Sequence, residues 1–130
     1  MQASKQLALV ALGGSLGAMA RYLLASWMQR ALPAAGFPFG TLLVNALGCL
    51  GIGLLAGLAE SRQAALGPAL RAFAMVGILG GFTTFSTFAH ETLALARDAD
   101  WERAFSNVAS QVVLGLGTCW LGYALARNTG

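Results

Sequence analysis

One hydrophobic stretch of this chain is interrupted by a polar, glycine-containing segment, Gly80-Gly81-Phe82-Thr83-Thr84-Phe85-Ser86-Thr87-Phe88. The segment lies within an apolar run over residues 70–95, long enough to cross a bilayer, which takes about 20 residues. Two glycines followed by two β-branched threonines disfavour a continuous helix, so local unwinding is expected. Unwound backbone at this depth is tolerated only where protein, a cavity or an ion supplies partners. The segment therefore predicts a broken membrane helix with a candidate ion site.

The composition of the 130-residue chain is that of a membrane protein, with 57% hydrophobic and 10% charged residues and a mean hydropathy of +0.67. Four stretches are long enough to span a bilayer: residues 7–28, 39–59, 70–95 and 104–126. The joints over 29–38, 60–68 and 96–103 are polar or contain Pro or Gly. We predict an all-α membrane protein with one four-span domain over residues 1–130, surrounded by membrane lipid. The first run is too long for a signal peptide, so the N-terminus is expected to be retained.

Several other classes of protein find no support in the sequence. The net charge of +3 comes from basic residues scattered singly at span ends, which does not indicate nucleic-acid binding. Cys49 and Cys119 lie mid-span without metal-ligand or disulfide spacing, so we interpret both as packing residues. One histidine and five scattered acidic residues provide no nucleophile–base pair or metal cluster, which argues against an enzyme.

Basic residues are divided evenly between the two sides of the predicted spans. One side holds Lys5, Arg62, Arg71 and Arg127, and the other holds Arg21, Arg30, Arg97 and Arg103. Lys and Arg normally concentrate on the cytoplasmic side, so this near-tie predicts insertion in both orientations and antiparallel pairing with a second copy. The alternative is that a short protein with few charges reaches a tie by chance.

Small residues recur at the spacing that lets membrane helices approach closely. Three G-x-x-x-G pairs are present, Gly13 with Gly17, Gly53 with Gly57, and Gly77 with Gly81; Gly48, Gly51, Gly115 and Gly122 add further small surfaces. Helices in lipid associate mainly through such surfaces. We interpret nearly all of these glycines as helix-packing residues.

Aromatic and hydroxyl side chains follow the expected break. Phe82, Phe85 and Phe88 recur at i, i+3 and i+6, which predicts three rings on one helical face. Thr84 and Thr87 share a neighbouring face, with Ser86 nearby. Aromatic packing is the alternative for the rings, but a lipid-facing surface gains nothing from four hydroxyls within six residues.

Spans two and four carry further polar groups. Thr41 and Asn45 are four residues apart on one face of span two. An unpartnered amide in hydrocarbon costs several kcal/mol, so Asn45 should face a cavity or another polar group; an interhelical hydrogen bond that only fixes packing is the alternative. Ser106, Asn107 and Ser110 either extend a polar track or lie at the interface where span four begins.

Hydroxyl and amide groups can donate hydrogen bonds to a negative ion, so a cluster of them without a nearby acid predicts that the segment binds an anion. The positive edge of a phenyl ring is a further, weak anion ligand. Composition does not choose among anions.

Arg21 lies roughly 20 Å along span one, so it either snorkels or faces a water-filled vestibule. Glu91 follows the polar segment, and we expect it either to pair with an arginine or to line the mouth of an ion pathway. His90 is interpreted as a residue at the membrane interface.

Three motifs are similar to those of the Fluc (CrcB) family of fluoride channels. They are Gly13-Gly14-Ser15-Leu16-Gly17-Ala18-Met19-Ala20-Arg21-Tyr22, Gly40-Thr41-Leu42-Leu43-Val44-Asn45-Ala46-Leu47-Gly48 and the segment quoted first. The resemblance covers essentially the whole chain. It implies a dual-topology antiparallel homodimer with two parallel pores, which exports fluoride passively across the bacterial inner membrane and so relieves fluoride toxicity.

The resemblance also implies roles for individual residues. Asn45 would be the amide donor of the pore, Phe85 and Phe88 the ring-edge ligands, and Thr84, Ser86 and Thr87 the pore hydroxyls. Carbonyl groups of Gly80 and Thr83 from both subunits would hold a central sodium ion, and Arg21 and Glu91 would belong to the vestibule. Some family members carry a tyrosine in the polar part of span four, where this chain has none, so the contribution of span four stays open.

Two other functions compete with a channel. A proton-coupled small multidrug transporter also has four short spans, but it needs a carboxylate in the first span, and residues 7–28 contain none. A noncatalytic subunit of a membrane assembly would use the glycine surfaces to bind another protein and would carry no ion.

Overall fold

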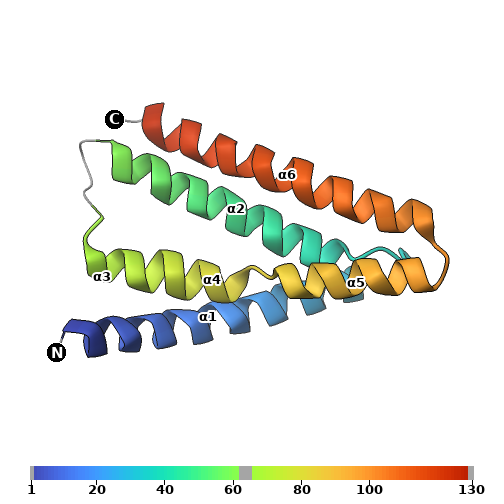
Figure 1. Cartoon of the computed structure of the whole chain (residues 1–130), viewed down its shortest axis with the longest axis horizontal. Coiled ribbons are helices and arrows are strands. Elements are labelled where there is room, and N and C mark those ends of the chain that lie inside the picture. Colours follow the sequence, from blue (N-terminus) through green and yellow to red (C-terminus); the bar gives the residue numbers. More distant parts are fainter. Residues whose placement is uncertain (1, 62–65, 129–130) are drawn as a thin grey trace.

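The computed structural model describes residues 2–61 and 66–128, and these residues form helices joined by short connections. In chain order the elements are α1 (Gln2–Ala31), α2 (Phe39–Glu60), α3 (Pro68–Leu70), the π-helix η1 (Arg71–Leu79), α4 (Gly80–Phe82), α5 (Phe85–Arg97) and α6 (Trp101–Asn128). Elements α3, η1, α4 and α5 follow one another in one line from Pro68 to Arg97, which we call the third rod of the bundle (Figure 1). Helix α1 begins and α6 ends at the same end of the bundle (Figure 1).

The four predicted spans are confirmed. Four helical stretches are long and apolar enough to cross a membrane, Gln2–Ala31, Phe39–Glu60, Pro68–Arg97 and Trp101–Asn128, and each includes one predicted span. The last joint is shorter than the predicted residues 96–103, because α5 continues to Arg97 and α6 starts at Trp101. Asp100 allows this tight corner, since its carboxylate accepts the Arg103 backbone N–H at 3.2 Å and the guanidinium at 3.0 Å. Arg62, counted in the charge balance, lies outside the described residues.

The backbone of the third rod leaves the helical conformation at Thr83 and Thr84, inside the segment for which local unwinding was expected. Gly80 and Gly81 are helical, whereas Thr83 (φ −83°, ψ 157°) and Thr84 (φ −152°, ψ 114°) are extended. Gly81 packs closely against α1, since a Cβ there would lie 2.4 Å from the Gly14 carbonyl oxygen. The loss of helical conformation therefore begins after the glycine pair.

The predicted row of three rings on one helical face is also wrong. Phe82 ends α4 and Phe85 begins α5, so the two extended residues between them interrupt the helical register. Phe85 and Phe88 do form a pair, with ring centroids 5.3 Å apart and planes at 67°. The two rings therefore pack edge to face against each other at the start of α5.

Packing of the four rods depends on glycine, as predicted. Helix α2 packs mainly against α6, and α1 packs against η1 and α4. A Cβ built on Gly17 would lie 2.1 Å from the Ile78 carbonyl oxygen, and one on Gly53 would lie 2.0 Å from that of Cys119. These distances leave no room for a methyl group, so the helix backbones themselves are in contact. Both cysteines, Cys49 and Cys119, are free and half-buried.

Substitution of Gly17 tests this packing. Gly17→Ala should destabilise the purified protein by about 1–3 kcal/mol, because the new methyl group forces α1 and the third rod apart. Thermal unfolding in detergent, followed as the loss of the monodisperse gel-filtration peak, measures the effect.

Gly117→Ala is the matched control, since a Cβ at Gly117 meets no atom within 4 Å. Its unfolding temperature should be unchanged or higher, because alanine is the better helix former. Equal unfolding temperatures for the two variants would contradict a packing role for Gly17.

Candidate functional site

Asn45 of α2 replaces the missing hydrogen bonds of the third rod. Its Oδ1 accepts the Thr84 backbone N–H at 2.8 Å, and its Nδ2 donates to the Thr84 carbonyl oxygen at 3.1 Å. One planar amide thus satisfies both backbone groups of an extended residue in a region that offers no water. The prediction that Asn45 faces a polar group is confirmed.

Gln111 of α6 completes the hydrogen bonding of Asn45. The second N–H of Asn45 Nδ2 donates to Gln111 Oε1 at 3.1 Å. A backbone N–H can only donate, so the Thr84 amide fixes the orientation of the Asn45 amide, and Asn45 in turn fixes that of Gln111. Sequence reasoning missed Gln111, although its position one helical turn after Asn107 places both amides on one face of α6.

Thr84 also begins α5 as its N-terminal cap. Its hydroxyl oxygen accepts the Thr87 backbone N–H at 3.1 Å and donates to Thr87 Oγ1 at 3.0 Å, and Ser86 Oγ lies 3.2 Å away. Thr84 is buried, whereas Ser86 and Thr87 are exposed in the single chain. The three predicted pore hydroxyls are therefore linked by hydrogen-bond contacts through Thr84, which is the buried member of the group.

These side-chain bonds release two backbone carbonyl groups. In a continuous helix the Thr84 N–H would bond the Gly80 carbonyl, and the Thr87 N–H would bond that of Thr83. Here the Thr84 N–H goes to Asn45 and the Thr87 N–H goes to the Thr84 hydroxyl. The carbonyl groups of Gly80 and Thr83 are therefore freed from the helical pattern at neighbouring positions.

A cavity of about 390 Å³ lies beside this junction. Residues from α2, η1, α4, α5, α6 and the extended pair line it; the polar ones are Asn45, Thr83, Thr84 and Gln111, and the rings of Phe85 and Phe88 form part of its wall. Phe85 is 79% exposed in the single chain. The structure thus brings Asn45, Thr84, Phe85 and Phe88 together, as predicted from the sequence.

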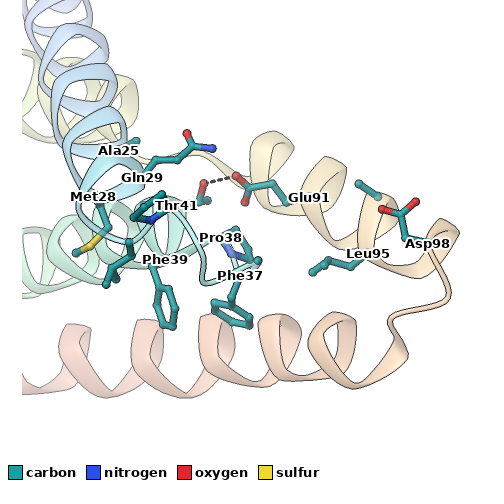
Figure 2. A pocket seen from close by; sticks show the side chains of 15 residues that line it. Ala25, Met28, Gln29, Phe37, Pro38, Phe39, Thr41, Glu91, Leu95 and Asp98 are labelled. Atoms are coloured by element: carbon teal, nitrogen blue, oxygen red, sulfur yellow. Dashed lines mark hydrogen bonds between the residues drawn. The ribbon is translucent and has the colours of Figure 1, made fainter.

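A second cavity, of about 330 Å³, lies at the end of the bundle near the α1–α2 connection. Thr41 donates to Glu91 Oε1 there at 2.7 Å (Figure 2). Glu91 Oε2 is buried and has no hydrogen-bond partner among the described residues. Glu91 thus pairs with a threonine rather than an arginine and lines a mouth-like cavity. Arg21 is absent from the described residues that line this cavity, so its vestibule role stays a prediction.

Asn107 joins α6 to α5 within the bundle. It is fully buried, and its Nδ2 donates to Thr92 Oγ1 at 2.9 Å, while the Thr92 hydroxyl donates to the Phe88 carbonyl oxygen at 2.8 Å. Asn107 is therefore buried between helices, whereas Ser106 is exposed and Ser110 is half-buried. Thr92 was missed because its partner lies on another helix.

A polar site of this kind, within a bundle of apolar helices long enough to span a membrane, is typical of membrane proteins that handle ions. The described part of the chain contains no group of three His, Cys, Asp or Glu side chains placed to hold a metal. Any ion at the α4–α5 junction would therefore meet amides, hydroxyls, carbonyl oxygens and ring edges.

Comparison with known proteins also points to a membrane protein that handles ions. Residues 8–123 match the family described as CrcB-like protein, Camphor Resistance (CrcB). The fluoride-specific ion channel FluC of Nitratidesulfovibrio vulgaris is 43% identical over 123 residues, covering 95% of this chain and 98% of the relative. The protein of the same name from Thermus thermophilus is 49% identical over 117 residues, or 90% of each chain. The chain belongs to the CrcB family and is a multi-pass membrane protein.

The cap formed by Thr84 gives a stability prediction. Thr84→Val keeps the shape of the side chain but removes the acceptor of the Thr87 N–H, so we expect a loss of about 1 kcal/mol and a lower unfolding temperature in detergent. Thr84→Ser keeps the oxygen and should unfold close to the wild type. Equal stability of the valine and serine variants would exclude a capping role for the hydroxyl.

Proposed function

We propose that this chain is a fluoride-selective channel that exports fluoride passively across the bacterial inner membrane and so relieves fluoride toxicity. The observation that carries the proposal is the α4–α5 junction, where Asn45 holds Thr84 beside the Phe85–Phe88 pair in a membrane-embedded cavity. Relatives that cover nearly the whole chain are named fluoride-specific ion channels. The same relatives support the prediction that the chain is not an enzyme.

The pore residues we propose are neutral donors and ring edges: Asn45, Thr84, Phe85, Ser86, Thr87 and Phe88. Neutral donors bind an anion without placing a formal charge in the membrane, where a charge is costly. Phe85 and Phe88 both line the cavity, and the edge of a phenyl ring carries the positive part of its quadrupole, which an anion can contact. Arg21 and Glu91 would belong to the vestibule that leads to these residues.

We propose further that the third span functions as a broken helix within an antiparallel, dual-topology homodimer. Phe85, Ser86 and Thr87 are exposed in the single chain, and hydroxyl groups gain nothing from contact with lipid. A second copy covering this face would close the cavity and complete the pore. The even division of basic residues supports insertion in both orientations.

A sodium ion at the centre of this dimer fits the oxygen atoms available. Backbone carbonyls are suitable ligands for a hard cation, and those of Gly80 and Thr83 are freed from helical bonds by Asn45 and Thr84. In the dimer both chains would supply the pair. When bound, the ion would hold the two junctions together through oxygen coordination.

The competing functions make different demands on the chain. A proton-coupled exchanger needs a membrane-embedded carboxylate in its first span, and Gln2–Ala31 contains no Asp or Glu. A noncatalytic assembly subunit would show no ion flux when purified.

Fluoride efflux from liposomes containing the pure protein tests the channel. The wild type should release fluoride and retain chloride. Asn45→Asp should lower the flux at least about tenfold, because a carboxylate loses both N–H bonds and repels the Thr84 and Gln111 oxygen atoms. Phe85→Ile should lower it as well, because it removes a ring edge.

Asn128→Asp and Phe105→Ile are matched controls at exposed positions of α6 and should conduct like the wild type. A wild type without fluoride flux would refute the channel and favour the assembly subunit.

Accessibility of a C-terminal tag from each side of the membrane tests dual topology. We expect both orientations in comparable amounts. Arg97→Gln and Arg127→Gln remove one charge from opposite ends and should bias the orientation in opposite directions. One orientation for all three proteins would exclude the antiparallel dimer.

A further inference from the structure

An anion in the central cavity needs N–H or O–H donors, and most donors around it are already engaged. Both N–H groups of Asn45 Nδ2 are used, one by the Thr84 carbonyl and one by Gln111 Oε1. The Thr83 hydroxyl donates to the Leu79 carbonyl oxygen at 2.9 Å, and the Thr84 hydroxyl donates to Thr87. In this arrangement Asn45 has no N–H left for an anion.

Three buried side-chain atoms have no hydrogen-bond partner among the described residues: Glu91 Oε2, Asn107 Oδ1 and Gln111 Nε2. The first two are oxygen atoms, and only Gln111 Nε2 is a donor. Its identity as nitrogen follows from the hydrogen bonds themselves, because the Thr84 N–H orients Asn45 and the Asn45 N–H requires an oxygen from Gln111. The unused donor beside this cavity therefore belongs to Gln111, which also lines it.

We infer that Gln111 is a further anion-binding residue of this pathway and controls the availability of Asn45. In the resting arrangement Gln111 Oε1 occupies one Asn45 N–H, and Gln111 Nε2 is enclosed. Rotation about the terminal torsion of glutamine, which is broad, releases that Asn45 N–H and turns Nε2 toward the cavity. A fluoride ion then replaces Gln111 Oε1 as the acceptor for Asn45 and receives an N–H from Gln111.

This exchange keeps the hydrogen bonds that hold the junction. Asn45 retains its two bonds with the Thr84 backbone while its remaining N–H changes from one acceptor to another. The number of donor–acceptor pairs does not fall when the anion enters, because the released Gln111 amide finds its acceptor in the anion. The inference rests on the proposed fluoride channel and adds a residue from α6 to it.

Fluoride flux as a function of concentration, measured with proteoliposomes of the full chain, tests the role of Gln111. Gln111→Met keeps the length of the side chain and removes both its donor and the acceptor that occupies Asn45. A hydrogen bond to a charged ligand contributes more than one between neutral amides, so the fluoride concentration for half-maximal flux should still rise about tenfold. Gln111→Glu keeps an acceptor for Asn45, removes the donor and adds negative charge, so its flux should be lowest of the three proteins.

Gln6→Met and Gln6→Glu make the same changes at an exposed position of α1 and should behave like the wild type. If the wild type conducts and Gln111→Met retains its half-maximal concentration and maximal flux, the inference is wrong while the channel stands. A wild type that carries no fluoride would refute the channel itself. A monodisperse gel-filtration peak shows that a variant is folded. If Gln111→Glu does not fold, the flux of Gln111→Met alone decides whether Gln111 binds the anion.

Discussion

The two hydrogen bonds between the Asn45 side chain and the Thr84 backbone are the interaction on which the rest of the structure depends. A bilayer leaves no water to satisfy an N–H and a C=O that have left a helix, and each unsatisfied group costs several kcal/mol. A primary amide carries a donor and an acceptor in one plane, so a single side chain satisfies both. An aspartate can accept the Thr84 N–H but offers no donor to the Thr84 carbonyl oxygen, and a leucine leaves both backbone groups unpaired inside the membrane.

Close helix packing and the polar site depend on each other. Asn45 reaches Thr84 only because α2 lies directly against the third rod, and Gly48, one turn after Asn45, makes this approach possible. A Cβ on Gly48 would lie 2.1 Å from the Thr83 methyl group. Glycines on α1 do the same from the other side, since Gly17 contacts the backbone near Ile78. The small residues therefore set the distance at which the amide forms its bonds, besides holding the bundle together.

The sequence predicted the structural features that depend on a single segment of the chain and not on contacts between segments. Four apolar runs define four spans because length and hydropathy are local properties, and the cost of burying Asn45 required a polar partner. The sequence predicted unwinding within the glycine–threonine segment but not which residues are extended, because that depends on hydrogen bonds between Thr84 and Asn45, 39 residues away. The π-helix at Arg71–Leu79 and the contacts of Gln111 and Thr92 likewise depend on which faces meet, which periodicity does not determine.

Neutral groups at this depth determine what kind of anion the proposed pathway favours. An ion that enters must exchange its water for hydrogen bonds to N–H and O–H groups, since the cavity contributes no formal positive charge from Asn45, Thr84 or Gln111. A small anion gains more from such bonds than a large one, because its charge lies closer to the donor. The α4–α5 junction also frees carbonyl oxygens near these donors, so the proposed sodium and fluoride sites would share one region of the bundle. One break in hydrogen bonding, stabilised from α2, would thereby serve both proposed sites without burying an ionised side chain beside it.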